Sequence, residues 1–215
     1  MLNLYLIRHA ESEMNAHNSR IGGRSNHIPL TELGKEQARL LGQRLSREGV
    51  HFDEIYASPA IRAFETAKIV CTEIGGLDRI VMRSELQELS EGDWEGKLRV
   101  EIYTEAMRAH INSHNWEFQP PNGESQKQVE ERMYGLVESL LAKDGAIGLF
   151  GHGMAFKCLL RGIMGFSPSI TYKVAINKTA ITRLKYDKQG WHLLSLNDVG
   201  HLIGIKKTPD RYSNP

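Results

Sequence analysis

The chain has 215 residues, of which 40% are hydrophobic and 25% are charged, and its formal net charge is +1. This composition is typical of a globular protein and argues against a surface that binds nucleic acid or a membrane through bulk charge. We expect a cytoplasmic protein with no membrane span and no signal peptide, because no apolar run approaches the roughly 20 residues that cross a bilayer.

The first predicted element is a short buried strand over residues 4–7, which stops at Arg8 and His9. A charged pair at the carboxyl end of a strand lies where open α/β sheets bind their ligands. An isolated Arg-His pair is more often just a charged strand end, so a functional interpretation depends on later segments. The polar stretch 16–29 is long for a loop in a compact domain, and long loops beside a site are often functional.

The next segments alternate between helix and strand. Thr31 is predicted to cap a helix, and residues 52–57 are predicted to form the second strand. Ser58 and Pro59 then indicate a helix start, with serine as the N-cap and proline at the first helical position. Arg62 would lie in the first turn of that helix, close to the end of the preceding strand.

The middle of the chain is less regular. After a short strand over 80–82, residues 86–96 mix carboxylates with glycine and tryptophan and have no clean period, so we expect an irregular loop able to close over a site. Residues 100–111 are predicted to be helical. His110 and His114 are four residues apart and could share a helix face, but no third metal ligand is evident, and we interpret them as surface residues.

The C-terminal half completes the sheet. Ser125 and Gln128 form a capping box that begins a helix, and the continuous apolar run 146–150 is typical of a central parallel strand. That run breaks at the Gly-His-Gly of residues 151–153, and another helix follows. Residues 180–196 read as a hairpin. The pattern predicts a three-layer α/β/α sandwich with a mostly parallel central sheet and an antiparallel edge.

We expect one domain over residues 1–202 and a polar C-terminal tail over 203–215. The edge hairpin could pair with a second copy, so a homodimer is left open. Cys71 and Cys158 have no CxxC spacing and are expected to be buried free thiols.

In this architecture four basic residues, Arg8, His9, Arg62 and His152, fall at strand ends or just beyond them. Arginine binds phosphate bidentately and keeps its charge, and the first N–H groups of a helix favour an anion. A neutral histidine can accept a phosphoryl group, fixed cations can stabilise the metaphosphate-like state in place of Mg²⁺, and a carboxylic acid can protonate the leaving alkoxide. Thiol, aspartyl and metal-dependent phosphatase signatures, and P-loop or GxGxxG motifs, are not found.

Several segments in order carry a family resemblance: RHAE at 8–11, PLTELG at 29–34, SPAIRAFETA at 58–67, LQELSEGDWEG at 86–96 and GHG at 151–153. Together they resemble the histidine phosphatase superfamily, in its phosphoglycerate-mutase-like branch, with Ala10 in place of the usual glycine of the RHG signature. The resemblance spans about residues 4–202. No single segment is specific, but several in order are.

The resemblance implies a role for each matching residue. His9 is the nucleophile that becomes phosphorylated, and Arg8, Arg62 and His152 hold the phosphoryl group. Glu88 donates a proton to the leaving group and then acts as the base that activates water.

Glu88 is chosen among nearby carboxylates because the family acid lies two residues after the leucine of L-x-E and ahead of the G-x-W-E-G element. We interpret Glu85, Glu91 and Glu95 as solvated loop charges. Asn15 and the backbone N–H of Gly153 are implied as secondary phosphate contacts.

The resemblance covers both phosphatases and mutases. GDWEG at 92–96 and FQPPNGES at 118–125 are closer to the phosphatase branch, so we expect a metal-independent phosphomonoesterase that needs no cofactor and acts through a phosphohistidine on a small phosphorylated metabolite. Phosphoglycerate mutase is the alternative, and a non-catalytic phosphate-binding module is the third reading.

The loop 16–29 departs from the family form, because Ile21-Gly22 stands where Gln-Gly is common, and this leaves the substrate open. This loop carries four basic residues that could contact an anionic substrate: His17, Arg20, Arg24 and His27. A basic residue in a loop is more often simply exposed to solvent.

Overall fold

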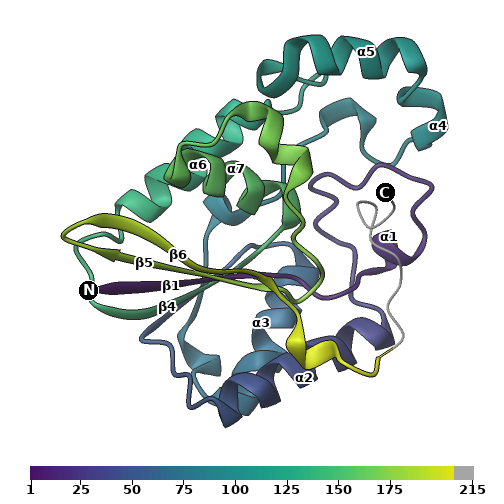
Figure 1. Cartoon of the computed structure of the whole chain (residues 1–215). Helices are drawn as coiled ribbons and strands as arrows, with labels where there is room; N and C mark the ends of the chain where they lie inside the picture. The colour runs from purple at the N-terminus through teal and green to yellow at the C-terminus, as the bar shows by residue number, and fades with distance from the viewer. Residues whose placement is uncertain (206–215) are drawn as a thin grey trace.

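The computed structural model of the chain describes residues 1–205, apart from the side chain of Asn115. Its centre is one six-stranded sheet in the order β3-β2-β4-β1-β5-β6, with helices on both faces (Figure 1). The predicted three-layer sandwich is therefore confirmed. Most of the C-terminal tail expected over 203–215 lies outside the described residues.

The sheet is parallel over four strands and antiparallel at one edge. β3, β2, β4 and β1 run parallel, β5 pairs antiparallel with β1, and β6 pairs antiparallel with β5. The last two strands form the predicted hairpin. The bounds are β1 Leu2–Arg8, β2 Glu54–Ala57, β3 Ile80–Met82, β4 Gly145–Gly151, β5 Ile181–Asp187 and β6 Gly190–Asp198.

The α-helices divide between the two faces, with α2 and α3 packed together on one and α6 and α7 on the other (Figure 1). Their bounds are α1 Glu13–Ala16, α2 Glu32–Arg47, α3 Ile61–Ile74, α4 Arg99–Ile102, α5 Glu105–His114, α6 Gln126–Glu138 and α7 Gly153–Met164. Short 3-10 helices cover Leu77–Arg79, Ser84–Leu86, Gly92–Trp94, Asn115–Glu117, Pro168–Lys173 and Gly200–Leu202.

Strand β1 is buried on both faces, which explains its unbroken apolar sequence. Leu2, Leu4 and Leu6 join the core that contains α6 and α7. Tyr5 and Ile7 point to the opposite side and join the core that contains α2 and α3. Because both faces are packed, the position at which β1 ends is fixed relative to its neighbours.

Two predicted helix starts are confirmed. The Thr31 hydroxyl accepts a hydrogen bond from Gly34 N at 2.9 Å and caps α2. The side chain of Ser125 and that of Gln128 form the reciprocal capping box of α6.

The predicted start of α3 is wrong. The helix begins at Ile61 with Ala60 as its N-cap, which offers no side-chain bond. Ser58 instead continues from β2, donating its N–H to Phe150 O at 2.9 Å, and its hydroxyl lies 2.8 Å from His152 Nε2. The same hydroxyl accepts from Ala60 N at 3.3 Å, so Ser58 combines a local turn bond ahead of the helix with a contact to a distant residue.

The single helix predicted over residues 100–111 is also wrong, because the structure has two helices there, α4 and α5. The break comprises Tyr103 and Thr104. The backbone angles of Tyr103, φ −86° and ψ 56°, lie outside the helical region.

Gly34 offers a test of how α2 packs against the segment that follows β1. A Cβ at this position would lie 2.0 Å from the backbone oxygen of Glu11, and backbone cannot move aside as a flexible side chain can. We expect Gly34→Ala to lower the free energy of unfolding by about 1–3 kcal/mol, as overpacking does, in urea denaturation. The matched control is Gly135→Ala on α6, where a Cβ would meet nothing within 4 Å. This substitution should raise the free energy of unfolding by up to about 1 kcal/mol. A neutral Gly34→Ala would contradict this packing.

Candidate active site

The carboxyl ends of the parallel strands bring the predicted site residues together. Arg8 is paired with Gly151 across the β1–β4 ladder, and His9 N donates to Gly151 O at 2.9 Å. His9 and His152 therefore leave the sheet side by side, and their ring centroids lie 5.1 Å apart.

The ring of His9 is oriented by its own neighbour in the chain. Nδ1 lies 2.7 Å from the carbonyl oxygen of Ala10, and a carbonyl can only accept, so the proton is on Nδ1 and the lone pair is on Nε2. Burial lowers the pKa of His9 well below its usual 6.5, and the positive charges of Arg62 and Arg8 lower it further. The side chain is therefore a neutral imidazole with a nucleophilic Nε2 at neutral pH.

His152 lies beneath the site and is fully buried. Its Nε2 bonds the Ser58 hydroxyl, while its Nδ1 has no hydrogen-bond partner among the described residues. Burial, together with the charges of Arg62 and Arg8, lowers the pKa of this imidazole well below its usual value. Sequence reasoning did not assign Ser58 to the site, because its Ser-Pro context indicated a helix cap.

Arg62 and Arg8 place two guanidinium groups beside the histidines. Arg62 is 5% exposed and donates to the carbonyls of Ser25 at 2.8 Å and Gly23 at 3.2 Å. Arg8 donates to Ile176 O at 2.5 Å. Burial lowers the pKa of Arg62 to about 10, so it stays charged at neutral pH.

The carboxylate of Glu88 lies at the start of α7. It accepts hydrogen bonds from Ala155 N at 2.9 Å, Met154 N at 3.2 Å and Leu89 N at 2.9 Å. The positive end of the helix dipole and three N–H groups therefore hold this carboxylate in one place.

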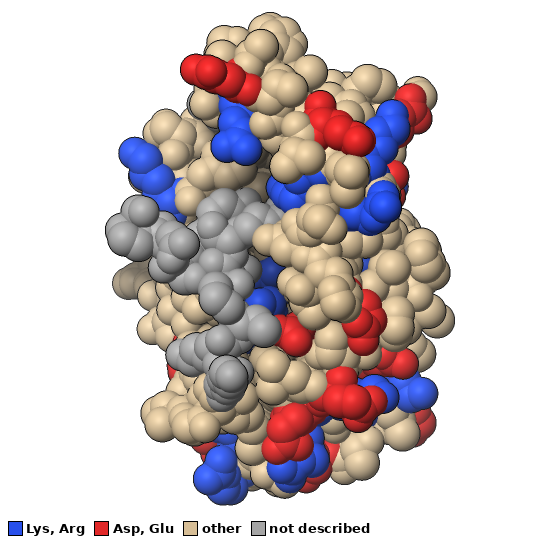
Figure 2. Space-filling view, turned by 90° about the vertical axis from the view of Figure 1, so that its right-hand side faces the viewer, with Lys and Arg blue, Asp and Glu red and all other residues tan. Residues whose placement is uncertain are grey.

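Arg8, His9, Arg62 and Glu88 line a cavity of about 660 Å³, whereas the buried His152 is not among its lining residues. This volume is typical of small-molecule sites. Its charged and polar end includes Arg8, His9, Asn15, Arg62, Glu88 and Gly153, whereas its walls carry apolar side chains that include Ile21, Leu89, Trp94, Tyr103, Phe118 and Met154. Lys, Arg, Asp and Glu are interspersed over the face drawn in Figure 2. Both signs of charge therefore lie side by side on the part of that face drawn in colour.

The two secondary positions predicted from the sequence also line the cavity. The Asn15 carboxamide oxygen accepts from Ser12 N at 3.2 Å and the Ser12 hydroxyl at 3.1 Å, which fixes its orientation. Gly153 is the first residue of α7, and a Cβ there would lie 3.2 Å from Arg8 Nε. The missing side chain lets the Arg8 guanidinium approach the helix start.

Comparison with known proteins identifies the family. Residues 4–199 match the histidine phosphatase superfamily (branch 1). The chain belongs to this superfamily. It is 31% identical to the "Probable phosphoglycerate mutase GpmB" of Serratia proteamaculans (strain 568), over 94% of this chain and 95% of that protein.

Solved structures of the superfamily share the fold. YhfR of Bacillus stearothermophilus aligns with a TM-score of 0.82 and 31% identity, over 94% of this chain and 100% of that one. A mutant phosphoserine phosphatase from Entamoeba histolytica, in complex with phosphoserine, aligns with a TM-score of 0.76 and 27% identity, over 94% and 100% of the two chains. The chain is therefore an enzyme of the histidine phosphatase superfamily, of the phosphatase or mutase-like kind. The roles given to individual residues are predictions.

Lys178 belongs to the site but was not predicted from the sequence. It lines the cavity, its ammonium lies 3.9 Å from Glu11 Oε2, and its charge adds to those that lower the pKa of His9. The next residue, Thr179, has a left-handed φ of 54° and donates its N–H to Arg8 O at 3.1 Å. No local sequence signal marks this turn, because its importance comes from the strand it contacts.

The interpretation of Glu91 as a solvated loop charge is wrong, because Glu91 lines the cavity and burial raises its pKa. The two histidines of α5 and the two cysteines are not among the lining residues. His110 and His114 are exposed on α5, with ring centroids 4.2 Å apart, and no group of three or more His, Cys, Asp or Glu within the described residues could hold a metal. Cys71 and Cys158 are buried free thiols, as predicted. Across the described part of the chain, no helix has the length and apolar character needed to span a membrane.

The lowered histidine pKa values predict how the free protein titrates. We expect the ring of His9 to stay neutral as the pH falls through 6.5, and Arg62→Gln to raise its pKa because one repelling cation is removed. NMR titration of the ring signals measures both. Since the unfolded chain binds protons here that the folded chain does not, stability should also fall below pH 6.5. A His9 that titrates at its ordinary pKa would contradict the electrostatic description.

Proposed function

We propose that this chain is a phosphomonoesterase that acts through a phosphohistidine at His9. The observation that carries the proposal is the pairing of a neutral His9, whose Nε2 holds the lone pair, with the buried Arg62 and the half-buried Arg8 at the end of one cavity. Neutral imidazole is a good nucleophile toward phosphorus, and fixed cations stabilise the charge on the transferring oxygens.

In the first step Nε2 of His9 attacks the phosphorus atom, and the bond from phosphorus to the ester oxygen breaks. Arg8 and Arg62 bind the equatorial oxygens, and Glu88, in its protonated form, gives its proton to the leaving alkoxide. In the second step Glu88, now a carboxylate, takes a proton from water as the water attacks phosphorus. The bond between phosphorus and nitrogen breaks, and inorganic phosphate and neutral His9 are released. The protein groups supply the positive charge, and the proposed mechanism needs no cofactor.

The dimensions of the cavity favour a phosphatase over a mutase. A mutase must keep water from its phosphohistidine until the phosphoryl group returns to a sugar acid, whereas a phosphatase must admit water. A three-carbon phosphoglycerate would leave much of a cavity of about 660 Å³ to solvent. The similarity to a phosphoserine phosphatase at 27% identity also supports phosphatase activity.

A phosphoglycerate mutase is the second candidate, because the chain is 31% identical to a protein named probable phosphoglycerate mutase. The two activities share the phosphohistidine and differ in the acceptor. Incubation with 3-phosphoglycerate and the bisphosphate distinguishes them: a mutase would form 2-phosphoglycerate, and a phosphatase would release phosphate.

The nucleophile is tested by phosphate release from a panel of small phosphomonoesters in the presence of EDTA. Wild type should hydrolyse at least one ester and form an acid-labile phosphoenzyme, and His9→Ala should lose both because the proposed nucleophile is removed. His51→Ala, which changes an exposed histidine, is the control and should behave as wild type. Activity that survives in His9→Ala, or that disappears with EDTA, would overturn the proposed mechanism. Phosphate binding with no turnover on any ester would indicate that the chain is a non-catalytic phosphate-binding module.

The role of Glu88 is tested by changing the leaving group. Phenyl phosphate and 4-nitrophenyl phosphate have similar shapes, but 4-nitrophenolate leaves with little need for a proton. We expect Glu88→Gln to slow phenyl phosphate hydrolysis by at least about 10²-fold, the scale of general acid catalysis, with a smaller loss on 4-nitrophenyl phosphate. Steady-state kcat/KM on both esters is the measurement, and equal losses would indicate that Glu88 is structural.

A further inference from the structure

Residues 19–26, here called the brace loop, lie between the phosphate end of the site and the loop that carries Glu88. On the phosphate side, the carbonyls of Gly23 and Ser25 accept both hydrogen bonds that orient the Arg62 guanidinium. The brace loop thus fixes an arginine of the proposed phosphate site through its main chain.

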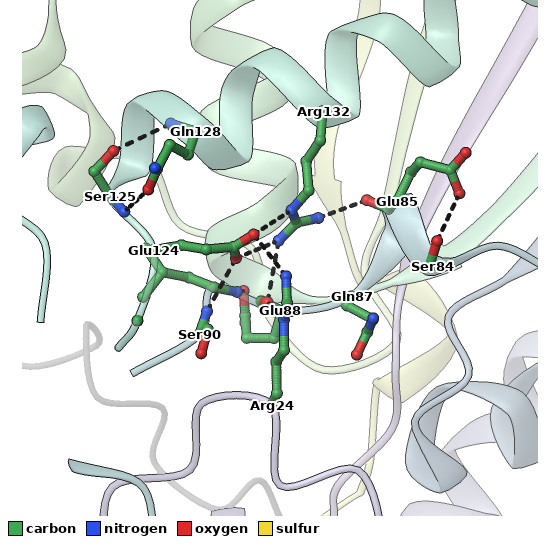
Figure 3. A network of polar contacts seen from close by, with 12 residues as sticks. Arg24, Ser84, Glu85, Gln87, Glu88, Ser90, Glu124, Ser125, Gln128 and Arg132 are labelled. Atoms are coloured by element: carbon green, nitrogen blue, oxygen red, sulfur yellow. Dashed lines mark hydrogen bonds and ion pairs between the residues drawn. The ribbon is translucent and has the colours of Figure 1, made fainter. Parts of the chain in front are cut away.

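The same loop reaches the Glu88 loop through Arg24 (Figure 3). Arg24 Nε donates to the backbone oxygen of Glu88 at 3.3 Å, and its Nη2 donates to Glu124 Oε1 at 2.6 Å. Its backbone N–H also donates to Glu95 Oε1 at 2.9 Å. The side chain of Arg24 is therefore directed at the main chain of the proposed acid, and it is not among the residues that line the cavity.

Arg132 of α6 meets the same two groups from the helix side (Figure 3). Its Nη2 lies 3.1 Å from the backbone oxygen of Glu88, and its Nε lies 3.0 Å from Glu124 Oε1. The side chains of Glu124 and Arg132 are only 18% and 17% exposed, so these charge-assisted bonds are partly shielded from water. Two guanidinium groups from different segments therefore hold one carbonyl, that of Glu88.

Glu88 is consequently fixed at both ends. The N–H groups at the start of α7 hold its carboxylate, and the two guanidinium groups hold its backbone oxygen. Removing one backbone anchor would leave the carboxyl near its place but less well aligned. Misplacement of a catalytic group by about 1 Å can cost about 10²-fold in rate.

We propose that Arg24 is a positioning residue for the general acid, through which the brace loop sets the distance between the Glu88 carboxyl and the phosphate held by Arg62. The inference rests on the acid role of Glu88 in the proposed function. It also gives a role to a loop whose departure from the family form the sequence left unexplained.

The test compares Arg24→Gln with wild type on phenyl phosphate and 4-nitrophenyl phosphate. We expect kcat/KM on phenyl phosphate, which reports the step that releases the leaving group, to fall about 10-fold, part of the range of general acid catalysis, with a much smaller fall on 4-nitrophenyl phosphate. The matched control is Arg20→Gln. Arg20 belongs to the same loop and donates to Gly96 O at 2.6 Å, but none of its hydrogen bonds reaches Glu88, so it should show no such difference between the esters.

A loss that is equal on both esters, or the same selective loss in Arg20→Gln, would overturn the role of Arg24. If Arg24→Gln does not fold, Arg24→Lys decides, because one ammonium can keep the charge beside Glu124 but cannot reproduce both bonds of the guanidinium. It should show a selective loss on phenyl phosphate, and its absence would overturn the proposal. Glu88→Gln is assayed in parallel: a selective loss there but not at Arg24 rejects this inference alone, and an equal loss there rejects the acid role in the proposed function.

Discussion

The parallel pairing of β1 with β4 is the constraint on which the site depends. Both strands end at the same level, with Arg8 opposite Gly151, so the next residue of each chain segment, His9 and His152, emerges at one point. A slip of one residue would turn the apolar side chains of β1 to the opposite face of the sheet. Since both faces of β1 are packed, the hydrophobic core sets the register, and the register sets the distance between the two imidazoles.

The site brings several positively charged groups together in one cavity. Arg8 and Arg62 lie beside two imidazoles that burial keeps neutral, and Lys178 adds a further cation to the cavity. Main-chain carbonyls of Ile176, Ser25 and Gly23 accept hydrogen bonds from the guanidinium groups. A bound phosphoryl dianion would relieve the repulsion among these cations. Neutral histidines and fixed arginines are thus two effects of the same burial.

Sequence reasoning predicted the sheet and its helices because their signals are local: apolar runs for β1 and β4, a hydroxyl cap for α2 and a capping box for α6. It failed at Ser58, where the side chain bonds His152, 94 residues away in the sequence. The contacts of Arg24 and Lys178 could not be predicted from the sequence for the same reason. Their partners are distant in the chain, and nothing in a loop sequence says which carbonyl or carboxylate an arginine or lysine will meet. The family resemblance identified the residues that gather in the cavity, but it could not identify what holds them there.

The start of α7 links the two halves of the proposed reaction. His152, the N-cap residue, makes no side-chain cap bond, and the Glu88 carboxylate takes that place by accepting from Met154 and Ala155. The same helix end, at Gly153, borders the position proposed for the phosphoryl group, so two anions would share one helix dipole. In the proposed reaction this carboxyl gives a proton to the leaving group in the first step and takes one from water in the second, so the N–H groups at the start of α7 would hold the acid beside the phosphoryl group through both steps.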